Sequence, residues 1–327
     1  MARKQPPARR PSLRLMQDST GTILIGYDGS DESDNAIRCA AELLAPSRAV
    51  VAHVWDSLAE LLRHTDIGHL TGTMKEAAHE FDTEDAYEAE RIAERGAELA
   101  QAAGFDAIPA VSHGKPKAWP TLLALAEQHR AAAVVVGSRG LGQVRSALLG
   151  SVSSGVLGHA DLPVLIVPPL EDAHAPGPIV IGYDGSQQAD AAIEAAGRLL
   201  KVREAVLQTV WTPYRAVAAA GVAGAPVAVA TKAAQEIDRG VREDAQRTAE
   251  RGARLAAAQG LEVQAEAVQA DANTWRALLE TAHAHRAAAV VIGSRGVSGF
   301  DSLLMGSVSR ALVHHAPAPV LVIRPPG

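Results

Sequence analysis

The sequence predicts an α/β protein built from two tandem doubly wound domains, each a five-stranded parallel sheet with helices on both faces. Short, uniformly apolar runs alternate with longer helical stretches, which is typical of parallel strands covered on both sides. The sequence GTILIGYDGS at Gly21 returns as GPIVIGYDGS at Gly177, an offset of 156 residues (177 minus 21). A period this long indicates a duplicated domain, because solenoid repeats run about 20 to 50 residues.

Each element of the first copy has its own signal. A β-rich run ending in DGS predicts a strand and a turn, and the following apolar residues at helical spacing predict a helix that Ser30 or Asp31 can cap. A long Ala/Glu/Arg-rich stretch predicts a second helix. The expected strands are Ile23–Tyr27, Ala49–Trp55, Phe105–Ser112, Ala132–Gly137 and Pro163–Pro168. The expected helices are Asp31–Leu44, Thr83–Ala103, Trp119–His129 and Ser146–Leu157, and the second copy repeats the order.

Domain boundaries follow from the repeat. At 327 residues the chain can hold about two domains, which we place at 21–168 and 179–325. The sequence PPLEDAHAPGP ends the first copy, and its four prolines predict an exposed linker at 169–178. Basic residues interleaved with prolines predict a disordered tail over 1–20, and Met16 is an alternative start to Met1.

Composition narrows the class of function. A formal net charge of −6 argues against a general nucleic-acid binder, which would carry a basic excess. Cys39 is the single cysteine, so no intrachain disulfide can form and a reducing, cytoplasmic setting is expected. The most apolar segment, 216–230, is too short to cross a bilayer and is interrupted by glycines and a proline. A membrane protein is therefore not expected.

The loops after the first and fourth strands are the expected ligand site, because ligands of doubly wound sheets bind at the carboxyl ends of strands where the strand order reverses. The fourth strand leads into the pattern G-x-x-G-(nine residues)-G-S. Its members are Gly137, Gly140, Gly150 and Ser151 in the first copy, and Gly293, Gly296, Gly306 and Ser307 in the second.

This pattern predicts a phosphate-binding loop. Glycines let the backbone approach an anion closely, and the amides at a helix start attract negative charge. Hydroxyl donors are expected from Ser151, Ser153, Ser307 and Ser309, and cations from Arg139 and Arg295. Turn glycines and helix-capping serines are the structural alternative. The strand-loop-helix context, present twice, favours phosphate.

A carboxylate and a valine complete each expected site. Asp28 and Asp184 follow the first strand of each copy, where a carboxylate can accept hydrogen bonds from ribose hydroxyls or a base. An Asp-Gly turn is the alternative reading. Val54 and Val210 end the second strands and can offer backbone groups and an apolar wall to a base, although ordinary strand core explains them equally well taken alone.

These residues resemble the universal stress protein family in its tandem-domain form, over nearly the whole chain. The resemblance implies Rossmann-like domains of the adenine nucleotide alpha hydrolase type, and up to two bound ATP molecules. The nucleotide-binding residues it implies are Gly26, Tyr27, Asp28, Val54, Val136, Gly137, Arg139, Gly140, Gly150, Ser151, Val152 and Ser153 in the first copy, and Gly182, Tyr183, Asp184, Val210, Ile292, Gly293, Arg295, Gly296, Gly306, Ser307, Val308 and Ser309 in the second.

The resemblance also implies an intramolecular pseudo-dimer, in which the fifth strands, Val164–Val167 and Val320–Ile323, pair. A further homodimer stays open. Tyr27 and Tyr183 depart from the residue common in the family at that position, which leaves the detail of the base pocket open.

Three functions remain to be separated. The first is a nucleotide-sensing stress or signalling module that reports to an unknown protein partner, with little or no hydrolysis and with Mg²⁺ held by phosphate oxygens rather than by side chains. The sequence contains no P-loop lysine, HExxH or GxSxG motif, so we assign no catalytic residue. The second is a slow ATPase or nucleotidyl-transfer enzyme that uses Asp28 and Asp184 as bases. The third is an oligomeric scaffold whose loops bind no nucleotide.

Overall fold

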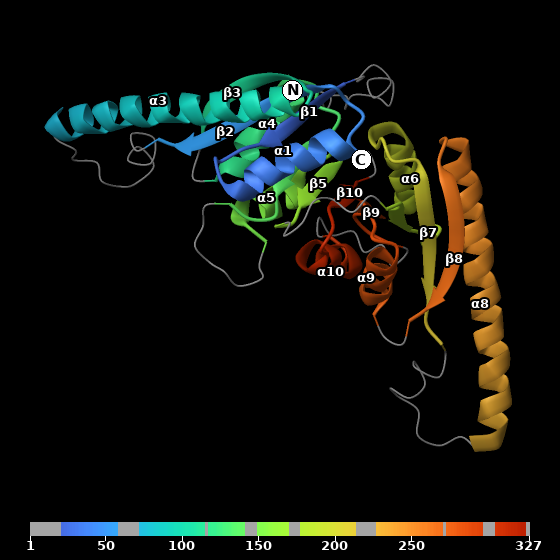
Figure 1. Ribbon diagram of the computed structural model, residues 1–327. Coiled ribbons are helices and arrows are strands. Elements are labelled where there is room, and N and C mark those ends of the chain that lie inside the picture. Colours follow the sequence, from blue (N-terminus) through green and yellow to red (C-terminus); the bar gives the residue numbers. More distant parts are fainter. Residues whose placement is uncertain are drawn as a thin grey trace, which may run out of the picture.

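Within the described part of the chain, ten strands form one sheet in the order β3-β2-β1-β4-β5-β10-β9-β6-β7-β8 (Figure 1). The computed structural model describes residues 21–57, 72–114, 117–140, 149–169, 177–213, 227–270, 273–296 and 305–324. The strands are β1 Thr22–Gly26, β2 Arg48–Asp56, β3 Asp106–Gly114, β4 Val134–Gly137, β5 Val164–Val167, β6 Ile179–Gly182, β7 Glu204–Trp211, β8 Glu262–Gln269, β9 Ala289–Gly293 and β10 Val320–Ile323. Each half contributes five parallel strands, as predicted.

Helices cover both faces of this sheet. They are α1 Asp31–Leu43, α3 Gly72–Ala102, α4 Ala118–Gln128, α5 Ser151–His159, α6 Gln187–Leu199, α8 Val227–Ala258, α9 Thr274–Ala284 and α10 Ser307–His315. Alternate residues of β1 show the layering: Ile23 and Ile25 pack with α1 and α3, while Leu24 packs with α4 and α5. The long helices α3 and α8 lie along the two outer ends of the sheet (Figure 1).

The two halves meet at β5 and β10, which pair antiparallel with Leu321 opposite Leu165. This is the strand pairing that the resemblance implies. A second seam joins the ends of α1 and α6, where Leu44 bridges to Leu200 and the amide of Lys201 donates to the carbonyl of Leu43 at 2.8 Å. One cluster of buried side chains includes residues of both halves, so the halves share a core.

Several predicted boundaries need correction. Helix α3 begins at Gly72 instead of Thr83, in keeping with the helix-forming residues between them. Helix α5 begins at Ser151 instead of Ser146, because the extended backbone of Gly150 (φ −60°, ψ 159°) precedes it. Strand β1 ends at Gly26, so Tyr27 lies in the following loop.

Some predicted features lie outside the described residues. They are the basic tail 1–20, most of the linker (170–176), and the spans 141–148 and 297–304 within the glycine pattern. Among the helices that the structure describes, none is long and apolar enough to cross a membrane.

Candidate functional site

Two cavities open at the carboxyl ends of the strands, one in each half. The first, about 470 Å³, is lined by all twelve residues predicted for the first copy. The second, about 360 Å³, is lined by all twelve predicted for the second copy. The sequence interpretation missed five residues of the first wall and four of the second: Ser33, Ala52, Ala118, Leu122 and Leu149, and Ala189, Gln208, Thr274 and Leu278. These positions lie within strands, within helices or next to a helix, where no motif distinguishes them from core.

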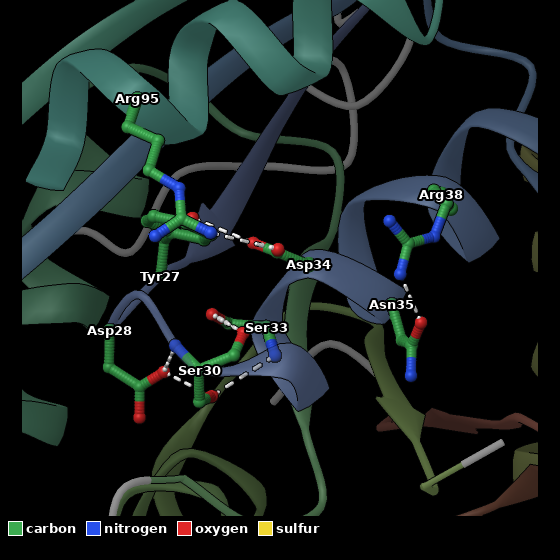
Figure 2. Close-up of polar contacts among 8 residues, drawn as sticks. All are labelled: Tyr27, Asp28, Ser30, Ser33, Asp34, Asn35, Arg38 and Arg95. Carbon is green, nitrogen blue, oxygen red and sulfur yellow. Dashed lines mark hydrogen bonds and ion pairs between the residues drawn. The ribbon is translucent and has the colours of Figure 1, made fainter.

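Asp28 is fixed by the turn that follows β1. Its Oδ1 accepts hydrogen bonds from the amide of Ser30 at 3.1 Å and from the Ser30 hydroxyl at 2.5 Å (Figure 2). Ser30 Oγ in turn accepts from the amide of Ser33 and caps α1, which settles the two capping alternatives in favour of Ser30. Asp184 repeats the arrangement, with Oδ1 accepting from the amide of Ser186 at 3.0 Å. Both the turn reading and a site carboxylate are therefore compatible with the geometry.

The second glycine of each pattern lies against this carboxylate. A Cβ on Gly140 would collide with Oδ2 of Asp28, and a Cβ on Gly296 would lie 2.5 Å from Oδ2 of Asp184. Any side chain here would displace the aspartate. The structure thus explains these glycines by the close approach of the loop after the fourth strand to the loop after the first.

Helix α5 starts at the cavity without a side-chain cap. Its N-cap residue is Gly150, which has no side chain and makes no side-chain cap hydrogen bond. Gly150, Ser151, Val152 and Ser153 line the cavity. The first turn of an uncapped helix carries unpaired amide donors and partial positive charge, which suits an anion. Gly306 and α10 repeat this arrangement in the second half.

The Ser153 hydroxyl has a different role from the one expected. It donates to the carbonyl of Gly137 at 2.7 Å, and the Ser309 hydroxyl donates to Gly293 at 2.9 Å. A hydroxyl has one proton, so these two serines brace the helix start against the end of the strand and do not supply the expected hydroxyl donor to a phosphate. Ser151 and Ser307 are exposed on the same turn.

In each half, a Tyr-Asp-Arg cluster holds the tyrosine that directly precedes the site aspartate, Asp28 or Asp184. The Tyr27 hydroxyl donates to Asp34 at 2.7 Å, and Arg95 of α3 forms an ion pair with Asp34 at 3.2 Å (Figure 2). Tyr183, Asp190 and Arg251 repeat the cluster. Gly96 lets α3 pack this closely, because a Cβ there would lie 2.6 Å from Cδ1 of Tyr27. The cluster holds the residue next to Asp28 in place.

The cluster predicts a pH dependence of stability. Burial, and then the hydrogen bond to Asp190, raise the pKa of Tyr183 to about 12. Burial, and then the hydrogen bond to Asp34, raise the pKa of Tyr27. Between the unfolded value near 10 and the folded value, the unfolded chain releases a proton that the native chain keeps, so stability falls as the pH rises. In urea melts from pH 9 to 11.5, wild type should lose stability more steeply than Tyr27→Phe/Tyr183→Phe. Equal slopes would contradict the assignment.

The far end of the first cavity is apolar, and that of the second is apolar except for Gln208. In the first half Ala52 and Val54 of β2, Val136 of β4, and Leu122 of α4 form it. A Cβ on Gly26 would lie 3.0 Å from Val136, so the strand end is packed tightly. Each cavity therefore has an anion-attracting end, an apolar end, and a fixed carboxylate. The described residues contain no group of three or more His, Cys, Asp or Glu side chains placed to bind a metal.

The fold and the duplicated cavities define a tandem doubly wound α/β protein with equivalent cavities in its two halves. The model of the universal stress protein family matches residues 20–168 and 177–324. Universal stress protein Rv1996 of Mycobacterium tuberculosis is 32% identical over 322 residues, which cover 93% of this chain and 95% of that protein. A universal stress protein of Mycolicibacterium smegmatis is 29% identical over 313 residues, 93% of this chain and 97% of that protein.

The fold agrees with a solved relative. The crystal structure of a universal stress protein from Archaeoglobus fulgidus aligns with a TM-score of 0.58 at 20% identity, over 95% of this chain and 100% of that chain. The chain belongs to the universal stress protein family, and it carries two copies of the family's domain.

Proposed function

We propose that the chain is an ATP-binding stress-response module that binds one adenine nucleotide in each cavity. The observation that carries the proposal is the uncapped start of α5 and of α10 at a cavity that also holds a fixed aspartate. Phosphates would lie against the helix amides and the glycine loop. The ribose would lie near Asp28 or Asp184, and the base at the apolar end.

Size and chemistry support this ligand class. Small-molecule sites commonly measure about 300 to 1,000 Å³, and both cavities fall in that range. Arg139 and Arg295 line the phosphate ends and add positive charge. Where Mg²⁺ accompanies the nucleotide, phosphate oxygens and water would hold it, since Mg²⁺ needs few protein ligands.

The proposal includes slow or no hydrolysis. Asp28 and Asp184 are the candidate bases of the enzyme alternative, and Oδ1 of each is already committed to a serine of the same turn. A module of this kind would act in the cytoplasm and report its nucleotide state to a protein partner.

One measurement tests the proposal directly. Protein purified without added nucleotide is denatured, and the released small molecules are identified and counted by mass spectrometry. We expect up to two adenine nucleotides per chain. Calorimetry on the stripped protein, from which bound nucleotide has been removed, should show ATP binding. A stripped chain that gives no heat with ATP would favour the scaffold reading.

The rate of ATP hydrolysis distinguishes the proposed nucleotide-binding module from the enzyme alternative. Radiolabelled ATP should be hydrolysed no faster by wild type than by Asp28→Ala/Asp184→Ala, apart from any loss of binding. Turnover that disappears in the double variant while ATP binding persists would support the enzyme alternative.

A further inference from the structure

The walls of the two cavities differ in polarity at three equivalent positions. The first has Ser33, Ala52 and Ala118 where the second has Ala189, Gln208 and Thr274. The polar side chain near the aspartate in the first half is thus replaced by alanine in the second, while two polar side chains replace alanines in the rest of the wall. The second cavity is also smaller, at about 360 against 470 Å³.

Gln208 lies in the apolar part of the second wall. It is on β7, two residues before Val210 and two after Val206, and side chains two apart on a strand point to the same face. Both valines pack in the apolar cluster that includes Leu278 and Ile292, which also line the cavity. Gln208 therefore lies at the end of the cavity proposed for the base, away from the glycine loop.

The carboxamide of Gln208 is only half satisfied. The side chain is 1% exposed, and Nε2 donates to the carbonyl of Ala277 on α9 at 3.2 Å. Its Oε1 is buried and has no hydrogen-bond partner among the described residues. A buried acceptor without a donor is unusual and costly in a native protein. With one Nε2 proton donated to α9, Oε1 is the atom of this side chain that has no partner among the described residues, and it can accept a hydrogen bond from a ligand.

We propose that Gln208 is a specificity-determining residue of the second site: its Oε1 accepts a hydrogen bond from an amino group on the base. The inference rests on the proposed nucleotide function. It makes the sites unequal, because the first site has Ala52 in place of this acceptor. The second site is then the more selective for a purine that carries an exocyclic amine, such as adenine, over hypoxanthine, which carries a carbonyl at the same position.

The test compares ATP with ITP at each site alone. Ser151→Glu places a carboxylate at the phosphate end of the first site and leaves the second available, and Ser307→Glu does the reverse. Calorimetry gives the ratio of ITP to ATP dissociation constants for each chain. We expect this ratio to be about tenfold larger in the Ser151→Glu chain, the difference that one unmade hydrogen bond to a buried acceptor produces.

Two substitutions then address the residue itself. Gln208→Met keeps the length of the side chain without its hydrogen bonds, and Gln208→Ala copies the first site. In the Ser151→Glu background, both substitutions should reduce the ratio of ITP to ATP dissociation constants to the value of the first site. In the Ser307→Glu background, Ala52→Gln should raise that ratio. Thermal melts show whether each variant is folded.

The outcomes are distinct. Equal ratios in the two single-site chains, or a ratio that Gln208→Met leaves unchanged, would overturn the inference while ATP binding supports the proposed function. A Ser151→Glu chain that binds neither nucleotide, beside a Ser307→Glu chain that binds both, would also overturn it, because Gln208 would then close the site. If neither single-site chain binds ATP or ITP, and wild type freed of bound nucleotide does not bind them either, the proposed function itself fails.

Discussion

A chain that carries both Ser151→Glu and Ser307→Glu should bind ATP about 100-fold more weakly than wild type, or not measurably. Each serine is exposed at the first position of its helix, on the turn whose amides line the cavity. A glutamate there repels phosphate within a few ångströms, and at an effective dielectric constant near 20 two unit charges 4 Å apart repel by about 4 kcal/mol. Calorimetry or nucleotide release by mass spectrometry measures the loss.

The substitution should leave the fold intact, because an acidic residue in the first turn of a helix stabilises it. Ser154→Glu is the matched control. It adds the same charge to α5 at an exposed residue outside the cavity lining, so ATP binding should change by no more than a few fold. Loss of binding in the control as well, or full binding in the double variant, would show that phosphate does not contact the start of these helices.

The sequence predicted the polar end of each cavity well because covalent spacing and topology determine it. A strand, a glycine loop and a helix start at fixed intervals can meet the first-strand loop in few ways, and Asp28 and Gly140 are in fact side by side. The apolar end was harder to predict. Ala52 and Leu122 have no motif, and only the fold brings a strand residue and a helix residue into one wall.

The hydrogen-bond partners of the site side chains could not be predicted from the sequence either. Ser153 carries the right group for a phosphate, yet its proton goes to the Gly137 carbonyl, a choice that depends on distances in the folded chain. The unpaired Oε1 of Gln208 could not be foreseen either, since a glutamine on a strand usually faces solvent. The repeat could have indicated the position, because Gln208 replaces Ala52 of the first copy while the residues two before and two after it, Val206 and Val210, match Val50 and Val54.

Leu321→Asp should destabilise the protein by about 4 kcal/mol or more. Leu321 is fully buried where β10 pairs with β5, opposite Leu165, and belongs to the core shared by the two halves. A carboxylate there would be buried beside apolar side chains and would leave a cavity. Urea unfolding followed by circular dichroism gives the free energy of unfolding. Leu321→Ala should still fold, at a cost of about 2 to 5 kcal/mol.

Ile108→Asp is the control for the seam. Ile108 lies on the edge strand β3 and is 49% exposed, so the same change of residue should cost about 1 kcal/mol or less. Because the seam joins both halves, Leu321→Ala should shift one common unfolding transition. If only one half lost stability while the other unfolded as in wild type, the halves would be independent domains. The contacts of β5 with β10 and of Leu44 with Leu200 would then contribute little to their coupling in solution.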